Sequence, residues 1–114
     1  MKILGICHDV FICSACIVVD GMVIAAIAEE RLDRIKMSRV FPLKAIEKCL
    51  EIAGMTIEDI DEIAVAWNPG IEMETVLPGY LSGRVMRAEH MIQVPARFMQ
   101  IAGMPASQIL SLNN

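Results

Sequence analysis

The sequence lacks the features expected of a protein that binds nucleic acid or crosses a membrane. Its 10 Lys and Arg residues face 14 Asp and Glu residues, so the net charge is −4, and no basic tract is present. Nucleic-acid binding therefore has no electrostatic support. The longest uncharged apolar run, Val10 to Val19, has ten residues, whereas a membrane-spanning helix needs about 20. His8 and Asp9 interrupt the amino-terminal hydrophobicity, so no signal peptide is expected. We predict a cytoplasmic chain with no nucleic-acid or membrane partner.

The four cysteines are expected to be reduced, because no secretory signal precedes them. Cys13 and Cys16 have the spacing of a C-x-x-C metal motif. In a strand, however, residues three apart point to opposite faces, so these two thiols could not share a metal. We interpret them as small buried side chains and predict no metal ligand in this chain.

Apolar runs dominate the first part of the chain, which has 114 residues and is 55% hydrophobic, enough for one modest core. Phe11 to Val19 and Met22 to Ala28 flank Asp20-Gly21. Asp-Gly tolerates the positive φ of a type I′ turn, so this pattern predicts a β-hairpin. Lys2 to Cys7 is predicted to be a strand that precedes it. Because the runs lack polar alternation, we expect both faces of the sheet to be buried.

A helix and a further strand are predicted after the hairpin. Pro42 suits the first turn of a helix, apolar residues recur at helical spacing from Leu43 to Ala53, and Gly54 is a typical terminator. Glu62 to Trp67 has the composition of a strand. A strand, a helix and a second strand in this order favour a parallel crossover.

The predicted fold class is α/β, with an antiparallel three-strand meander followed by a helix and a parallel strand. This is the opening half-lobe of an RNase H-like fold, the unit used in the actin-like ATPase superfamily, and we assign it to residues 1–70. Residues 71–114 are predicted to be a mainly helical continuation, interrupted by Pro95 and incomplete at the carboxy end. The acidic stretch from Thr56 to Glu62 is expected to be a helix start capped by Thr56 and Asp59. It lacks the loop glycine and ligand spacing of a calcium site.

Three motifs in order give the chain a recognisable family resemblance. They are the S-A-x-x-V-x-D-G hairpin from Ser14 to Gly21, the E-E-R-x-x-R-x-K segment from Glu29 to Lys36, and the F-P-x-x-A-I-x-x-C-L helix from Phe41 to Leu50. Together they resemble the amino terminus of the carbamoyltransferases of nodulation-factor and antibiotic biosynthesis, collinearly from Lys2 to about Gly70. Many members of that family place His-Asp directly before the Ser-Ala of the second strand. Here His8-Asp9 lies earlier, and four residues separate it from Ser14.

The resemblance implies a longer, ATP-dependent O-carbamoyltransferase. In such an enzyme the carbamoyl group of carbamoyl phosphate passes through carbamoyl-adenylate to a hydroxyl of a small-molecule substrate, near a divalent metal. The metal-binding histidines would belong to a paired-histidine motif expected beyond Asn114, since this chain has no H-x-x-x-H spacing. We therefore expect an amino-terminal fragment that is inactive alone and binds neither ATP nor the metal completely. Its partner would be the rest of the polypeptide or a complementary subunit, with a homo-oligomer as a further alternative.

The charged segment that follows the hairpin holds most of the candidate site residues. Arg31, Arg34 and Lys36 are predicted to bind the phosphate of the donor, because arginine forks and lysine charges suit phosphate oxygens. Glu30 is the candidate general base for the acceptor hydroxyl. The remaining candidates for substrate or phosphate contacts are His8, Asp9 and Ser14. The alternative interpretation of the segment is a surface ion-pair network, and the alternative function is a non-catalytic α/β interaction module.

Overall fold

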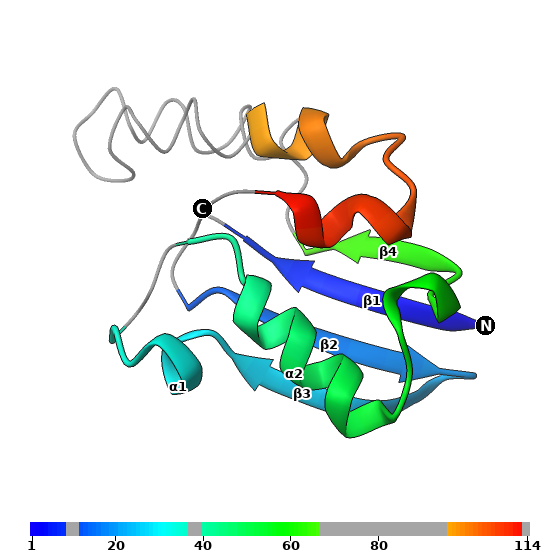
Figure 1. Cartoon of the computed structure of the whole chain (residues 1–114), viewed down its shortest axis with the longest axis horizontal. Coiled ribbons are helices and arrows are strands. Elements are labelled where there is room, and N and C mark those ends of the chain that lie inside the picture. Colours follow the sequence, from blue (N-terminus) through cyan, green and yellow to red (C-terminus); the bar gives the residue numbers. More distant parts are fainter. Residues whose placement is uncertain (9–11, 37–39, 67–95, 113–114) are drawn as a thin grey trace.

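The structure is a computed structural model, and it describes residues 1–8, 12–36, 40–66 and 96–112. Its centre is a four-stranded sheet in the order β3-β2-β1-β4. Strands β1 (Lys2–Cys7), β2 (Ser14–Val19) and β3 (Met22–Ala28) form an antiparallel meander. Strand β4 (Glu62–Val65) runs parallel to β1. The predicted α/β topology is confirmed at this level (Figure 1).

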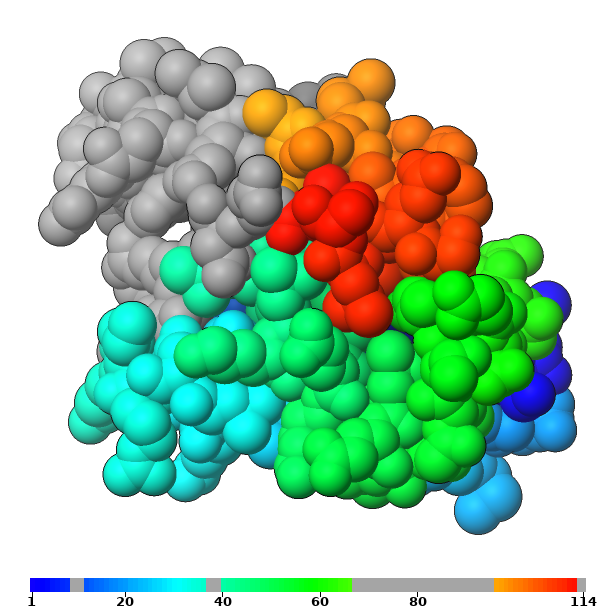
Figure 2. Space-filling model, in the orientation of Figure 1, coloured from blue at the N-terminus to red at the C-terminus, as the bar shows by residue number. Residues whose placement is uncertain are grey.

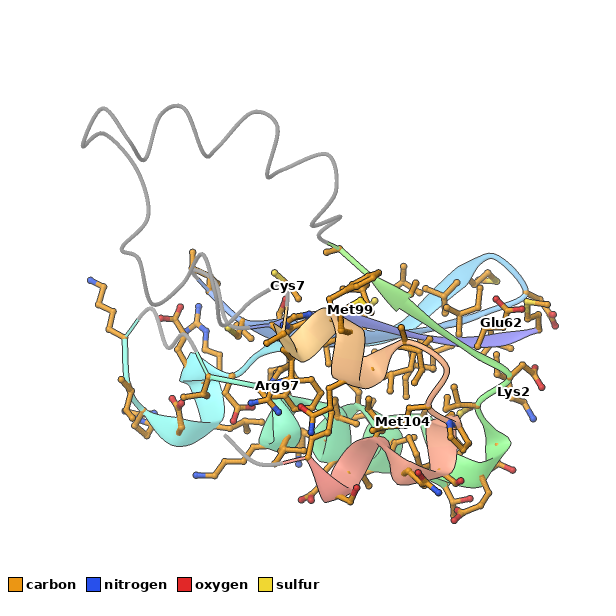
Figure 3. The ribbon with its side chains drawn as sticks, turned by 90° about the horizontal axis from the view of Figure 1, so that it is seen from above. Lys2, Cys7, Glu62, Arg97, Met99 and Met104 are labelled. Atoms are coloured by element: carbon orange, nitrogen blue, oxygen red, sulfur yellow. The ribbon has the colours of Figure 1, made fainter. Side chains whose placement is uncertain are left out.

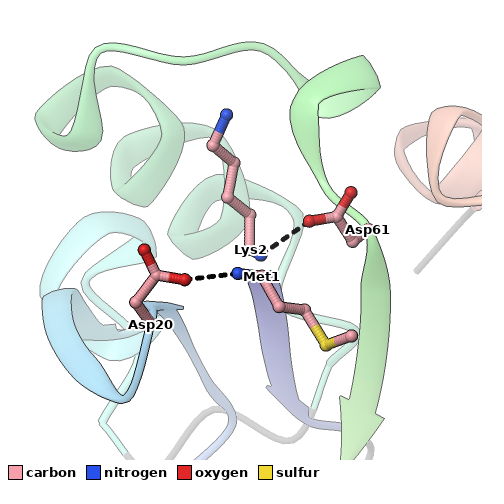
Figure 4. Close-up of polar contacts among 4 residues, drawn as sticks. All are labelled: Met1, Lys2, Asp20 and Asp61. Carbon is pink, nitrogen blue, oxygen red and sulfur yellow. Dashed lines mark hydrogen bonds and ion pairs between the residues drawn. The ribbon is translucent and has the colours of Figure 1, made fainter.

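The hairpin turn has the backbone that Asp-Gly predicts. Asp20 and Gly21 adopt φ values of 49° and 84°, both in the left-handed region that a type I′ turn needs. The amino-terminal ammonium pairs with the Asp20 carboxylate, and the Lys2 N–H donates to Asp61 Oδ2 at 2.8 Å (Figure 4). These contacts tie the start of β1 to the hairpin turn on one side and to the start of β4 on the other.

Helix α2 (Leu43–Ala53) makes the crossover between β3 and β4. It ends where predicted, because Gly54 adopts φ 67° and its N–H donates to the Glu51 and Leu50 carbonyls. The short 3-10 helix η1 (Ile57–Asp59) follows and has the predicted capping box, with the Thr56 N–H donating to Asp59 Oδ2 at 2.8 Å. Single-turn α1 (Glu30–Asp33) connects β3 to the segment before α2.

The core lies between the sheet and α2. Residues from both layers are buried there: Leu4, Ile6, Ile17, Ala25, Phe41, Ala45, Ile46, Cys49 and Leu50. The 3-10 helix η2 (Ala106–Ser111) adds the fully buried Ile109 to the same cluster. In the space-filling view η2 lies beside α2 on the same face of the molecule (Figure 2).

The prediction that both sheet faces are buried does not hold for the described residues. Figure 3 shows α2 and η2 on one side of the sheet, and no described helix packs on the other. On β3, Met22, Val23 and Ile24 are all exposed. The continuous apolar pattern was misleading partly because of a bulge. Val18 pairs with Val23 while Ile17 pairs with Ala25, so Ile24 is an extra residue that interrupts the alternation.

Three further sequence predictions fall partly outside the described residues. The first hairpin strand begins at Ser14 rather than Phe11, and β4 ends at Val65; Phe11 and Trp67 are not described. Residues 96–101 are helical, but residues 67–95 are not described, so the assignment of 71–114 as a helical continuation stays a prediction. Within the described residues no helix is both long and apolar enough to cross a membrane.

Candidate functional site

The end of β3 and the turn of α1 are fixed by a compact set of backbone bonds. The Glu29 N–H donates to the Cys13 carbonyl at 2.8 Å, and the Glu29 carbonyl accepts from Leu32 and Asp33, both at 2.9 Å. The Arg34 N–H donates to the Glu30 carbonyl at 3.1 Å and ends the turn in a left-handed conformation, with φ 64°. The side chains that follow the strand are therefore carried by a well-defined turn.

Four of the predicted site residues meet in one surface hollow beside this turn. Glu30, Arg31, Arg34 and Lys36 line it, and its volume is about 390 Å³. Three cations and one carboxylate give these residues a net charge of +2. Two guanidiniums and an ammonium around one hollow can attract an anion and bind its oxygens. We name this group of four residues the cationic hollow.

Glu29, which directly precedes these four residues, contacts α2 and does not line the cationic hollow. Its side chain is only 1% exposed, and its Oε1 accepts the N–H of Ala45 at 2.7 Å. Ala45 is in the first turn of α2, whose N-cap Pro42 supplies no side-chain hydrogen bond. Glu29 thus caps α2 and is not one of the described residues that line the hollow. Strand alternation could have indicated this, because Glu29 continues the inward face of Ile27.

His8 is also buried, under an aromatic ring. The centre of its imidazole ring lies 6.1 Å from the centre of the Phe41 ring. The guanidinium carbon of Arg97 lies 5.0 Å from the centre of the same Phe41 ring. His8 is fully buried and does not line the cationic hollow among the described residues. Sequence reasoning missed Arg97, since nothing in the local pattern connects residue 97 with residues 8 and 41.

The other predicted residues lie elsewhere. Ser14 is on the second face of the sheet, where it lines a separate apolar groove of about 570 Å³. Asp9 is outside the described residues. The structure thus brings Glu30, Arg31, Arg34 and Lys36 together and separates them from His8 and Ser14.

Neither the cysteines nor the acidic residues form a metal centre in the described part of the chain. No group of three His, Cys, Asp or Glu side chains there could hold one ion. Cys13 is buried, whereas Cys16 lines the groove on the second face. Burial raises the pKa of the Cys7 thiol and of the Cys49 thiol, which disfavours the reactive thiolate form at both positions.

The chain is similar in sequence to known proteins from rhizobia and a cyanobacterium. Nodulation protein NolNO of Sinorhizobium fredii is 55% identical over 51 residues, covering 45% of this chain and 8% of that protein. The uncharacterised protein sll1178 of Synechocystis is 36% identical over 80 residues, covering 70% of this chain and 13% of its own length. An uncharacterised 19.2 kDa protein of Rhizobium etli is 53% identical over 45 residues, covering 40% of this chain and 26% of that protein.

These matches span only a small share of the relatives' own length. A family model extends over much more of this chain: the model described as "Carbamoyltransferase N-terminus" matches residues 2–107. That range includes β1 to β4, α2 and the four residues of the cationic hollow. The chain belongs to the carbamoyltransferase N-terminus family.

Proposed function

We propose that this chain is the amino-terminal part of an ATP-dependent O-carbamoyltransferase. The reaction would transfer the carbamoyl group of carbamoyl phosphate, by way of carbamoyl-adenylate, to a hydroxyl of a small-molecule substrate. Family membership supports the transferase class. The observation that carries the assignment of residues is the cationic hollow, where Arg31, Arg34 and Lys36 converge beside a carboxylate. The reaction requires a compartment that supplies ATP, which agrees with the predicted cytoplasmic location.

The hollow suits an anionic carbamoyl donor for electrostatic reasons. Both donors named above carry phosphate oxygens, which arginine binds through paired N–H groups and lysine through a point charge. Hydrogen-bond donors of the protein that are already in place when negative charge develops stabilise the transition state without further reorganisation. Glu30, on the same wall, would accept the proton of the attacking hydroxyl.

The metal and the nucleotide are assigned to the rest of the longer enzyme. Among the described residues no donor set fits a divalent ion, so we derive no step through a metal on this chain. The residues of the cationic hollow would hold and orient the anionic end of the donor. Activity would require the remaining polypeptide or a complementary subunit.

Replacement of Arg31 by Ala in the full-length protein tests this proposal. Loss of one preorganised donor should weaken transition-state binding by about 2–4 kcal/mol, or roughly 30- to 1,000-fold in kcat/KM. Lys48→Ala is the matched control, because Lys48 is a lysine on the exposed side of α2 that pairs with Glu51 at 3.4 Å. It should leave carbamoyl transfer unchanged.

Two negative results would have different meanings. A wild-type enzyme that transfers no carbamoyl group to any hydroxyl acceptor, with ATP and carbamoyl phosphate supplied, would refute the proposed reaction. Full transfer by Arg31→Ala with a lowered melting temperature would instead assign the hollow to a structural role and leave the reaction standing.

The second candidate function is a non-catalytic interaction module. The exposed Met22, Val23 and Ile24 side chains favour it, because large apolar side chains grouped on a surface often mark a binding site. An active wild-type enzyme that loses transfer with Arg31→Ala would exclude this alternative.

A further inference from the structure

The second face of the sheet has an unusual row of small side chains across all four strands. Ala26, Cys16, Gly5 and Ala64 are aligned by the strand register, one from each strand. The next row contains Ala28, Ser14 and Cys7. Together these residues form the floor of the apolar groove of about 570 Å³. We name this surface the small-residue face.

The small-residue face does not have the composition of a surface that faces water. An antiparallel sheet with one solvated face alternates apolar and polar residues. Here, Ser14 is the polar side chain within the two rows, and no described residue of either row is charged. Val23, which lies on the same face, is 66% exposed. Leaving such a surface open would cost free energy in proportion to its apolar area.

At Gly5 this surface has no room for a side chain. A Cβ at Gly5 would lie 2.6 Å from Cys16 Sγ, so the Cys16 thiol leans over the place where a side chain would stand. Small residues on one surface interdigitate with large ones on its partner. An amphipathic helix that carries bulky apolar side chains at three- and four-residue spacing would be complementary to this surface.

The family supplies a source for such a helix. The match covers only 8% of nodulation protein NolNO and 13% of the Synechocystis relative. Most of the polypeptide in these relatives therefore lies outside the matched segment. We propose that the small-residue face is the docking surface for a helix from that remaining part of the same polypeptide. This inference rests on family membership and not on the proposed reaction.

The chain has a built-in probe of this docking, because its cysteines are divided between the two faces. Cys7 and Cys16 line the groove and are half-buried, whereas Cys13 and Cys49 are buried. In the native longer protein, all four thiols should react slowly with a maleimide. Ala64→Glu should increase the reaction rates of Cys7 and Cys16 on the order of 100-fold, the scale of a local opening. Cys13 and Cys49 should stay protected and report that the core is intact.

Matched variants make this result specific. Ala64 is exposed in this chain, so a glutamate there should disturb docking more than the sheet itself. Ile52→Glu introduces the same charge on α2, where Ile52 is 55% exposed, and should leave Cys7 and Cys16 protected. Rapid labelling of Cys7 and Cys16 in the wild-type longer protein would overturn the proposal. Continued protection in both Ala64→Glu and Ala26→Glu would also overturn it.

A photocrosslink identifies the occupant directly and remains decisive if a glutamate variant unfolds. A small diazirine amino acid at position 26 of the longer protein would be irradiated, and the linked peptide identified by mass spectrometry. A peptide from beyond residue 114 of the same molecule is expected. A peptide from within residues 1–114, a peptide from a second copy, or no linked peptide would each overturn the proposal.

Discussion

Replacement of Glu29 tests the most consequential contact that the structure adds to the sequence. The Glu29 carboxylate is buried and accepts the Ala45 N–H at 2.7 Å. It thereby joins the end of β3 to the first turn of α2 across 16 residues of sequence. Glu29→Ala would leave the Ala45 amide without this acceptor, and Glu29→Gln would keep an oxygen in nearly the same place while removing the charge.

The expected cost follows from three effects. Loss of a hydrogen bond to a charged group costs about 1.5–3 kcal/mol, and loss of a negative charge at a helix amino terminus adds about 0.3–1 kcal/mol, more when it is buried. Removal of a buried carboxylate also relieves a desolvation penalty, which offsets part of the loss. We expect Glu29→Ala to lower the free energy of unfolding by about 2–4 kcal/mol, and Glu29→Gln by about half as much or less.

Urea unfolding followed by far-ultraviolet circular dichroism measures both values. Glu51→Ala is the control, because the Glu51 side chain is 72% exposed and pairs with Lys48 on the surface. Its effect should stay below about 1 kcal/mol. Hydrogen exchange should also speed up at the Ala45 amide in Glu29→Ala. Equal losses in Glu29→Ala and Glu51→Ala would refute the assignment of Glu29 as the cap of α2.

Two further predictions concern the sheet and the short helix η1. Gly5→Ala should lower the free energy of unfolding by about 1–3 kcal/mol, because the new Cβ would meet Cys16 Sγ at 2.6 Å. Adding Cys16→Ala should recover part of this loss. Strict additivity of the two substitutions in a double-mutant cycle would contradict this contact. The Thr56 N–H hydrogen bond lowers the pKa of Asp59 below its ordinary value of 3.8, so this carboxylate stabilises the fold above that value and loses its effect as the pH falls through the lowered pKa. Asp59→Asn should therefore lower the melting temperature at pH 7, and the difference should shrink in acid; a difference that is constant with pH would contradict this assignment.

Local chemistry explains why much of the fold was predictable from sequence. Asp20-Gly21 fixes the hairpin, since its two positive φ values are accessible to few other residue pairs. Gly54 and the Thr56–Asp59 box act within one turn of the helices that they end or begin. The one-turn geometry that brings Arg31 and Arg34 to a common hollow is also local, because it depends on the three-residue spacing between Arg31 in α1 and Arg34 at its C-cap.

Contacts between distant segments were not predictable in the same way. Glu29 stands beside Glu30 in the sequence, at the start of the charged segment, but the strand turns its side chain toward α2. His8, Phe41 and Arg97 come from three separate segments and meet only in the folded chain. The second face was expected to be buried because the strands lack polar alternation, yet no described helix covers it. Composition indicates that such a face needs a cover but does not say which segment supplies it.

Arg34 combines a strained backbone with a charged side chain. It adopts φ 64° and ψ 19°, a left-handed conformation that glycine adopts without penalty and other residues adopt at a cost. Glycine is the common choice at the end of a helix for this reason. The turn therefore does not itself call for an arginine at this position, and the arginine side chain lines the cationic hollow.

A pair of substitutions at Arg34 separates the fold from the proposed function. Arg34→Ala and Arg34→Gly both remove the guanidinium, so both should reduce carbamoyl transfer by the full-length protein by a similar factor, roughly 30- to 1,000-fold. Only Arg34→Gly relieves the left-handed strain, so it should be more stable than Arg34→Ala by about 1 kcal/mol in urea unfolding. If transfer instead followed stability, with Arg34→Gly close to wild type in both, the arginine would act through the turn and would have no contact with the donor.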